Sequence, residues 1–375
     1  MRPVVAIDAH KASCTYVVRH WDQTHAGPRR IPSTRDALTK LAHAYPEHDF
    51  VLEVCSVHEW MMDLFRAEGI HAMAVIPPKK GPVGKKSDDD DSTRLAKKHQ
   101  AGELEEVYVA VPEIRVMRDQ VRQHEFLKRK WVSVNNHIQH ALNRWNFHPT
   151  ASDSNRQVGI YSADTRHQIL SRFPHLHALF EVADVLDQRM RTSRKRIEEL
   201  GKSIPEVQRL QSVPGFGPII TLALYTQIVD ITRFDRAEQL VRYMGLDPVH
   251  GSSGDSHWDG HRISKKGTSF IRGLLAQGAW SHVTFCPDSD ISVNYRRLVL
   301  RGKSKQQALM MVMRRLVKTS FWLLKENRDF TMNGPARSAI CRTPRGAALT
   351  SVEMEAPAAM RRMQPLAGTQ LGCRE

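Results

Sequence analysis

The hydrophobic pattern changes its period near Pro112, and no other feature of the 375-residue sequence constrains the fold as strongly. Before Pro112, apolar runs of strand length alternate with segments of helical spacing, a pattern that predicts a mixed sheet with flanking helices. After it, apolar residues recur three or four positions apart, as on one face of a helix. We therefore expect an α/β domain over residues 1–111 and a mainly helical remainder.

The elements of the α/β domain follow from apolar runs bounded by turn-forming residues. Helical spacing predicts helices over Thr34–Ala44 and Trp60–Glu68. Strands are predicted over Val4–Asp8, Cys14–His20, Thr24–Ile31, Phe50–Cys55, His71–Ile76 and Val107–Val111.

Two long apolar seams occupy residues 112–204, with the polar, turn-rich segment Asn146–Asp164 between them. This arrangement predicts a long helical hairpin that connects two domains. Two interpretations stay open, namely a coiled-coil arm through which copies assemble, or helices that pack on the body of the protein. Residues 205–330 are expected to form a compact C-terminal domain, and residues 331–375, which lack periodicity, a disordered tail.

The charge balance indicates the class of partner. The chain has 55 Lys and Arg against 40 Asp and Glu, a net charge of +15. Such an excess favours a polyanion, because basic side chains displace counterions from phosphates, and nucleic acid is preferred over a membrane surface. The sequence has no membrane-length apolar run, no signal-peptide organisation and five scattered cysteines, so a cytoplasmic location is expected.

Four carboxylates of the N-terminal domain stand where a sheet would bring them together. Asp8 ends the first apolar run, Glu53 lies inside an apolar strand, and Asp88 and Asp91 share a face at a predicted helix start. Such carboxylates can hold two Mg²⁺ ions that orient a phosphate. Each also has a simpler explanation: a turn Asp, a Glu paired with a base, or an acidic run favoured by the helix dipole.

The segment around Gly215 and Gly217 predicts a helix, a tight turn and a second helix that begins at Pro218. The free amides at a helix start can receive a phosphate, so this helix-hairpin-helix-like motif is a candidate site for the DNA backbone. A plain turn between two helices is the alternative.

A polar loop with Ser252, Ser253 and Gly254 precedes a basic segment. A serine hydroxyl there could attack a phosphodiester while cations stabilise the developing charge. The local pattern alone favours a loop with no catalytic role. The neighbouring cations are Arg262, Lys265, Lys266 and Arg272.

Taken together and in order, these motifs resemble the transposases of the insertion-sequence one-ten family over about residues 4–330. That family pairs a RuvC-like domain bearing an Asp-Glu-Asp-Asp set with a C-terminal transposase domain bearing a serine. The matching segments are Ala6-Ile-Asp-Ala-His-Lys11, Val51-Leu-Glu53, Lys86-Ser-Asp88-Asp-Asp-Asp91-Ser, Pro214-Gly-Phe-Gly-Pro218, Gly245-Leu-Asp-Pro248, Ser252-Ser-Gly254, Ile263-Ser-Lys-Lys-Gly267 and the helix Ser304–Leu324.

The resemblance implies an RNase H/RuvC-like fold in which Asp8, Glu53, Asp88 and Asp91 bind Mg²⁺, and a serine, Ser253, that joins DNA covalently. It also implies a structured guide RNA, because members of the family are guided by an RNA that their own element encodes. The sequence departs from the family pattern at two places. Asp89 or Asp90 could replace a ligand within the run of four aspartates, and Ser252 could be the nucleophile.

We therefore predict a Mg²⁺-dependent, site-specific recombinase of double-stranded DNA that works as a homo-oligomer, a dimer or a tetramer. Two alternatives stay open: a RuvC-like nuclease or junction resolvase that uses water, and a non-enzymatic nucleic-acid-binding protein. Besides the cations named above and the hairpin glycines, the residues expected to contact nucleic acid are Arg296, Arg297, Arg314 and Arg315.

Overall fold

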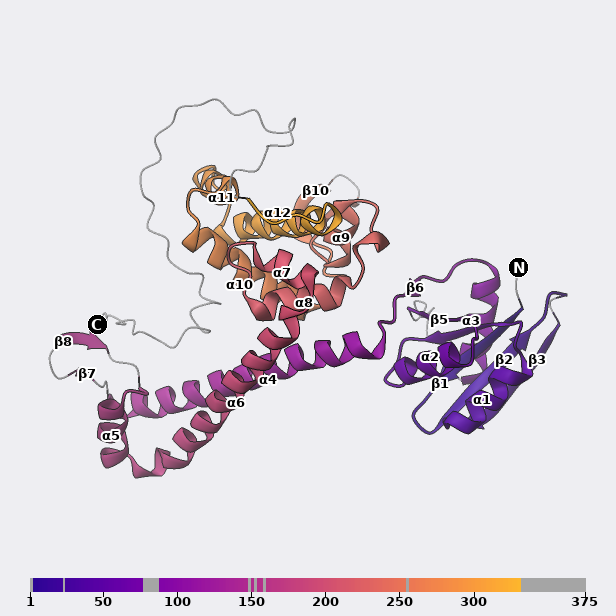
Figure 1. Cartoon of the computed structure of the whole chain (residues 1–375), viewed down its shortest axis with the longest axis horizontal. Helices are drawn as coiled ribbons and strands as arrows, with labels where there is room; N and C mark the ends of the chain where they lie inside the picture. The colour runs from indigo at the N-terminus through magenta and orange to yellow at the C-terminus, as the bar shows by residue number, and fades with distance from the viewer. Residues whose placement is uncertain are drawn as a thin grey trace. The chain divides into compact units, whose positions relative to one another are not determined.

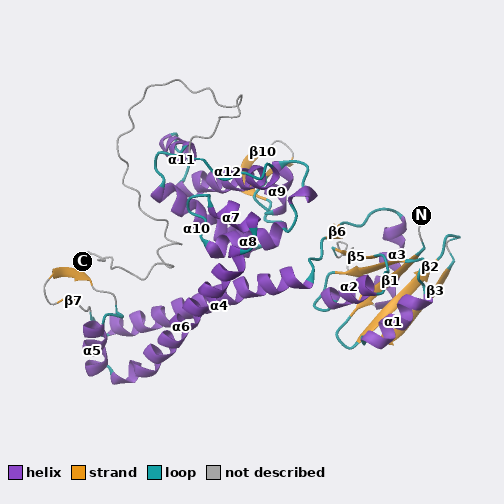
Figure 2. Cartoon of the chain, viewed as in Figure 1, coloured by secondary structure: helices purple, strands orange, loops and turns teal. Residues whose placement is uncertain are grey.

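The computed structural model describes residues 3–22, 24–76, 88–147, 150–151, 154–157, 160–253 and 256–331, without the side chains of residues 88–90, 150–157 and 250–262. The chain divides into two compact units, Met1–Arg115 and Val116–Glu375, which are described separately below. Figure 1 labels the elements, and Figure 2 shows strands concentrated in the first unit and helices in the second.

A six-stranded sheet with the order β3-β2-β1-β4-β5-β6 forms the centre of the first unit. β1, β4 and β5 are parallel to one another, whereas β2, β3 and β6 run antiparallel to their neighbours. The strands are β1 Val4–Ala9, β2 Ser13–Arg19, β3 His25–Pro32, β4 Asp49–Glu53, β5 Ala72–Val75 and β6 Glu106–Val107.

Helices cover both faces of this sheet because its central strands are apolar on both sides. Val5 and Ile7 of β1 pack in one core with α1 (Arg35–Ala44) and α2 (His58–Ala67). The alternate residues of β1 pack in a second core against α3 (Asp88–Gln100) on the opposite face. The expected N-terminal α/β domain is therefore confirmed as a mixed sheet with flanking helices.

The predicted strand Val107–Val111 is wrong for most of its length, since β6 ends at Val107. Val109 is buried in the core under α2, and its carbonyl accepts a hydrogen bond of 2.7 Å from Nη2 of Arg66. This carbonyl is thus bonded to a side chain rather than to a neighbouring strand, and α4 begins at Pro112.

Two long helices, α4 (Pro112–Arg144) and α6 (His177–Lys202), form an arm in the second unit. Ile138 of α4 and Phe180 of α6 belong to one core, which a shorter helix between them in the chain also joins, while Val121 shares a core with Ile197 near the other end. The two helices are therefore antiparallel, as the apolar seams predict. The elements between them are β7 Thr150–Ala151, β8 Ser154–Gln157, α5 Ala163–Arg172 and the 3₁₀ helix η1 Pro174–Leu176.

The rest of the second unit is a helical bundle around one large core, which Val121 and Ile197 of the arm also join. Serine and threonine hydroxyls cap several of its helices: Thr268 caps α10, Ser289 caps α11 and Ser304 caps α12. The mainly helical C-terminal part is confirmed. Its elements are α7 Pro205–Gln211, α8 Pro218–Ile228, η2 Ile231–Arg233, α9 Ala237–Tyr243, β9 Pro248–Ser253, β10 Ser256–Ile263, α10 Ser269–Phe285, α11 Asp290–Leu300 and α12 Lys305–Lys325.

The strands β9 and β10 correct one expectation, because the serines were predicted to lie in a loop. Ser252 and Ser253 instead belong to β9 and pair with His257 and Ser256 of β10. Within the described ranges, no helix has the length and apolar composition that crossing a membrane requires.

Candidate functional site

Asp8 and Glu53 lie side by side at the carboxyl ends of two parallel strands. β1 pairs with β4 in a register that sets Ile7 opposite Leu52, and the next residue along each strand is Asp8 and Glu53, respectively. Carboxyl ends of parallel strands are the usual place for functional side chains in such sheets. The sequence predicted this convergence, and the strand register agrees with it.

The helix that carries the remaining aspartates packs on the same face of the sheet as Asp8. Alternation along β1 places Asp8 on the side of Val4 and Ala6, which contact α3. At the end of α3, Gln100 donates to the carbonyl of His20 at 3.4 Å, and His99 lies 3.3 Å from the carboxylate of Asp49.

Both of those contacts lie at the amino ends of β1 and β4, because His20 follows the antiparallel β2 and Asp49 begins β4. The start of α3, with its run of aspartates, is therefore directed toward the opposite end of the sheet, where Asp8 and Glu53 are. The backbone of the first unit thus places Asp8, Glu53 and the start of α3 at one end of one face.

Two of these carboxylates are largely shielded from solvent and have basic neighbours. Asp8 lies 3.3 Å from Nε2 of His10, and Asp91 accepts a hydrogen bond of 2.8 Å from Arg94. The side chain of Asp88 lies outside the described residues, as do those of Asp89 and Asp90. Among the described side chains, no three His, Cys, Asp or Glu lie close enough together to hold a metal ion.

The two glycines of the predicted hairpin have different roles. Gly215 has a φ of +92°, and a Cβ atom there would lie 2.5 Å from the carbonyl oxygen of Gly278 and 2.7 Å from the backbone nitrogen of His282. Gly215 is thus required for the close approach of the turn to α10. Gly217 is the exposed N-cap residue of α8, and a Cβ atom there would meet nothing.

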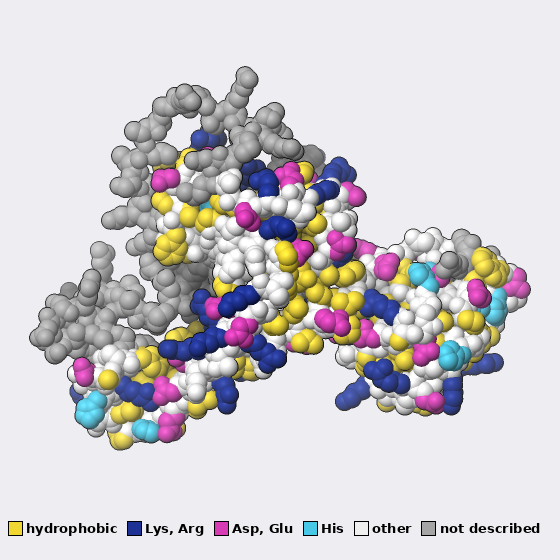
Figure 3. Space-filling model, viewed as in Figure 1, with side chains coloured by type: hydrophobic (Ala, Val, Ile, Leu, Met, Phe, Trp, Pro, Cys, Tyr) yellow, Lys and Arg dark blue, Asp and Glu magenta, His cyan; other side chains and the backbone are white. Residues whose placement is uncertain are grey.

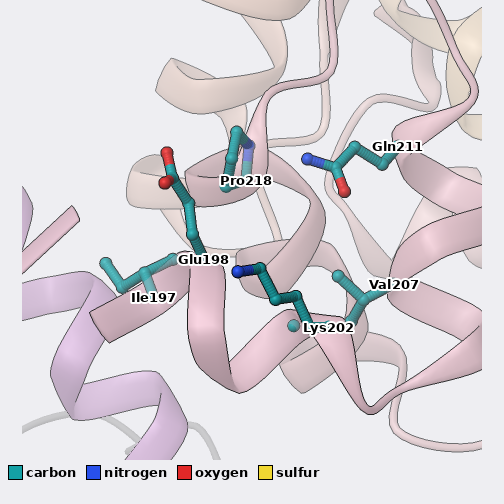
Figure 4. Close-up of a pocket in the computed structure, with 7 residues that line it drawn as sticks. Ile197, Glu198, Lys202, Val207, Gln211 and Pro218 are labelled. Carbon is teal, nitrogen blue, oxygen red and sulfur yellow. The ribbon is translucent and has the colours of Figure 1, made fainter. Parts of the chain in front are cut away.

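A cavity of about 250 Å³ lies beside this hairpin, between the end of α6, α7 and the start of α8 (Figure 4). Its polar lining has one acidic, one basic and one amide side chain, so it has no strong preference for an anion. The lining residues are Ile197, Glu198, Gly201, Lys202, Val207, Gln211 and Pro218.

His282 is a residue of this region that the sequence analysis missed. It is fully buried, its Nδ1 lies 2.8 Å from the carbonyl oxygen of Pro214, and its Nε2 lies 2.9 Å from the hydroxyl of Ser289. Burial lowers the pKa of His282. The ring joins the hairpin turn to the N-cap of α11. A histidine in the helix 269–285, whose residues are mostly apolar, was the only signal in the sequence.

The strands β9 and β10 form a β-hairpin that carries both candidate serines, and we call it the serine hairpin. Two of the predicted phosphate-binding arginines bond to the backbone at its base. Arg314 donates through Nε to the carbonyl of Leu246 at 2.5 Å, and burial lowers its pKa. Arg272 donates to the carbonyl of Gly267. Between these contacts, the Ser264 hydroxyl donates to the carboxylate of Asp247, which closes the base of the hairpin.

The other predicted cations differ in exposure. Lys265, Lys266 and Arg315 are exposed, whereas Arg296 and Arg297 of α11 are half-buried. The side chains of Arg262 and of both candidate serines lie outside the described residues. Of the predicted cations whose side chains are described, three are therefore exposed.

Residues 207–294 match the family model described as transposase, IS116/IS110/IS902 family. The match is to a transposase family. The matched residues include the hairpin turn, both strands of the serine hairpin and Arg272. The resemblance of the motifs to insertion-sequence one-ten transposases is confirmed at this level.

Similar proteins carry names of the same kind. The y4qE protein of Sinorhizobium fredii, whose name assigns it to the transposases, is 24% identical over 84% of each chain. The transposase for insertion sequence element IS1111A of Coxiella burnetii is 34% identical over 25% of each chain. The pilin gene-inverting protein of Moraxella bovis is 31% identical over 32% of this chain and 37% of that protein. The last two alignments span less than half of the relatives' length, and two of the three names are those of transposases.

Proposed function

We propose that this chain is the transposase of a mobile element, a Mg²⁺-dependent recombinase that cuts and rejoins double-stranded DNA through a covalent phosphoserine linkage. The observation that carries the proposal is the side-by-side register of Asp8 and Glu53, with the acidic start of α3 directed to the same end of the sheet. In the matched transposase region, the serine hairpin supplies the nucleophile.

The N-terminal unit is proposed to be RuvC-like, with its carboxylates as Mg²⁺ ligands. Carboxylate oxygens are hard donors of the kind that Mg²⁺ prefers, so Asp8, Glu53 and Asp91 fit the ion, and Asp88 would complete the set. When bound, the ion would neutralise phosphate charge and polarise the phosphorus–oxygen bonds. The protein itself contributes a rigid parallel strand pair that fixes the spacing of the first two carboxylates.

In the proposed reaction, Oγ of Ser253 attacks the phosphorus of a phosphodiester and loses its proton to a base. The bond from phosphorus to one deoxyribose oxygen breaks, and that oxygen leaves as a hydroxyl after it takes up a proton. Attack by the hydroxyl of another strand reverses these steps and releases the serine. Lys265 and Lys266, exposed beside the hairpin, would hold the phosphate charge during the exchange.

The family resemblance supports two further parts of the proposal, a structured guide RNA and a homo-oligomer. Recombination requires more than one strand break, which a dimer or a tetramer would supply. The positive charge of the chain favours both nucleic acids equally.

A trap for the covalent intermediate tests the proposal. Purified protein is incubated with Mg²⁺, DNA of the element's ends and RNA transcribed from its flanks, and the products are separated on a denaturing gel. We expect a protein–DNA band that disappears in Ser253→Ala and in Asp8→Asn but remains in Ser252→Ala. Because Asp8→Asn removes a charge and little volume, the Tm of this variant should stay close to that of the wild type.

Cleaved DNA without an adduct, insensitive to either serine substitution, would instead identify a metal-dependent nuclease with water as its nucleophile. Binding without cleavage in all variants would identify a non-enzymatic nucleic-acid-binding protein.

A further inference from the structure

Eight cations form a belt at one level of the arm. They come from two stretches without acidic residues, 126–133 of α4 and 188–196 of α6. Figure 3 shows Lys and Arg side chains gathered over these helices. We define the arm belt as Lys128, Arg129, Lys130, Arg189, Arg191, Arg194, Lys195 and Arg196, of which all but the half-buried Lys128 are exposed.

We propose that the arm belt binds the phosphate backbone of a nucleic-acid duplex, a contact separate from those of the serine hairpin. The inference rests on the proposed function, because it adds a surface for the same nucleic-acid substrate.

The two stretches lie level with each other because the helices are antiparallel. Two cores flank the stretches along the arm: one contains Val121 and Ile197, and the other contains Ile138 and Phe180. Electrostatics agrees with this placement. Burial lowers the pKa of His124, and the charges of Lys128 and Arg194 lower it further against the opposing effect of Glu125, so both cations lie near one ring.

The acidic residues that border the belt do not neutralise it. Asp187 pairs with Arg191, and Glu198 pairs with Arg194. By contrast, Arg189, Lys195 and Arg196 have no acidic partner among the described residues. On α4, Glu125 is buried, and its carboxylate faces Lys128. The outer surface of the belt therefore has a clear positive excess.

The density of charge suits a duplex. The α6 stretch spans nine residues, roughly 13 Å at a rise of about 1.5 Å per residue. A duplex carries one phosphate charge per roughly 1.7 Å of axis, hence about eight over that length. Over the same distance the belt has eight cations, of which Lys128, Arg191 and Arg194 are paired with an acidic residue and the other five have no acidic partner among the described residues.

An acidic protein surface is a poorer fit. Protein interfaces have an apolar centre of buried side chains, whereas the exposed Phe126 of the α4 stretch has the ammonium of Lys130 over its ring and Met190 is half-buried. The belt is also fixed to the transposase-matching region, because Nζ of Lys128 donates to Oε1 of Gln277 in α10 at 2.9 Å. A duplex held by that region would have the belt within the same unit.

The test uses the triple variant Arg189→Gln, Lys195→Gln, Arg196→Gln in the full chain. Its affinity for a fluorescent 25-base-pair DNA duplex and for an RNA stem of equal length is measured by anisotropy over a salt series. We expect at least a tenfold loss of affinity for one or both duplexes near 100 mM salt. The slope of log K against log salt should fall by about 3, since each lost phosphate contact removes about 0.9.

Two control variants keep the test decisive. Arg35→Gln, Lys40→Gln, Lys97→Gln removes the same charge from exposed sites of the first unit and should leave affinity within about twofold. Asp187→Asn, Glu198→Gln adds net charge to the belt without removing any cation, and should raise affinity. If the triple variant does not fold, the rise in duplex affinity expected of this second variant still tests the proposal.

A loss of affinity for DNA alone, for RNA alone or for both supports the proposal and shows which duplex the belt binds. Unchanged affinity for both, or an equal loss in the charge-matched control, overturns it. Unchanged duplex affinity combined with capture of an acidic protein would assign the belt to a protein partner and likewise overturn the proposal. Because the test measures binding, the arm-belt proposal can be overturned while the covalent adduct still forms. Equally, the adduct can be absent while the belt still binds a duplex.

Discussion

His282 is held at both ring nitrogens inside the helical bundle, by the Pro214 carbonyl and the Ser289 hydroxyl. A carbonyl only accepts, so Nδ1 carries the proton that is donated to Pro214, while Nε2 lies within hydrogen-bond distance of the Ser289 hydroxyl. A second proton would place an uncompensated charge in a fully buried site, which explains why burial lowers the pKa of His282.

This residue predicts how stability depends on pH. The pKa values of His282, His48 and His124 all lie below the ordinary value of 6.5, chiefly because of burial. Their contribution is complete above pH 6.5 and is lost as the pH falls, because the unfolded chain then binds protons that the folded chain does not. The loss is at most about 1.4 kcal/mol per pH unit for each proton.

Tm measured at pH 7.5 and pH 5.5 checks this expectation. The wild type should lose stability on acidification. His282→Gln should melt lower at pH 7.5, because it loses the double hydrogen bond, but its further fall to pH 5.5 should be smaller. Equal falls in both proteins would show that His282 does not titrate on unfolding.

Single residues also mark the limit of what the sequence predicts. The position of Glu53 inside an apolar strand predicted a shared site with Asp8, and the strand register agrees. Arg272 and Arg314 were predicted as phosphate contacts, yet their guanidinium groups donate to backbone carbonyls. The Leu246 carbonyl lies far from Arg314 in sequence, and no local pattern reveals a partner of that kind.

At the scale of elements, the hairpin between α7 and α8 is defined by its contact with α10. Gly215 allows backbone to approach backbone, and His282 bonds the turn from the other side. The sequence predicted the two helices and the turn from its Gly and Pro residues. It did not predict what the turn packs against, because α10 lies more than fifty residues further along the chain.

A pair of alanine substitutions separates packing from exposure in this turn. Gly215→Ala should destabilise the second unit by about 2–4 kcal/mol, because it combines an unfavourable φ with an overpacked contact. Gly217→Ala, with ordinary φ and free space, should cost about 1 kcal/mol or less. Thermal melts followed by circular dichroism compare the two. A Gly215→Ala variant as stable as Gly217→Ala would contradict the packing role.

The β9–β10 hairpin illustrates why some elements stay hidden in a sequence. Its strands are rich in Gly, Ser and His and lack apolar alternation, the main signal for a strand. Their pairing is instead supported at the base, by the bond between Ser264 and Asp247 and by the two arginine contacts. The prediction that the serines lie in a loop was therefore wrong.

At the scale of the whole molecule, nucleic-acid binding by the basic residues and catalysis at the carboxylate site should be separable. The positive excess of the chain lies in the second unit, because Met1–Arg115 has 16 Lys and Arg against 17 Asp and Glu, whereas the predicted carboxylate site lies in the first unit. Binding should therefore survive when the carboxylates are neutralised.

A salt series on the whole chain measures this separation. Duplex affinity should fall about 10³-fold or more between 50 and 200 mM salt, as expected for a protein with six to ten phosphate contacts. The duplex affinity of Asp8→Asn should stay within about twofold of the wild-type affinity at each salt concentration. A shallow salt dependence would mean that the basic excess does not contact phosphates, and a large loss of affinity in Asp8→Asn would mean that binding depends on the carboxylate site.

The central claim is the covalent bond between a serine of the hairpin and DNA, and the peptide that carries that bond tests it most directly. Protein trapped with DNA is digested with nuclease and protease, and the peptide containing residues 252–253 is analysed by fragmentation mass spectrometry. We predict a nucleotide attached through phosphate to Oγ of Ser253. An unmodified serine pair in protein that has cleaved its DNA would contradict the claim.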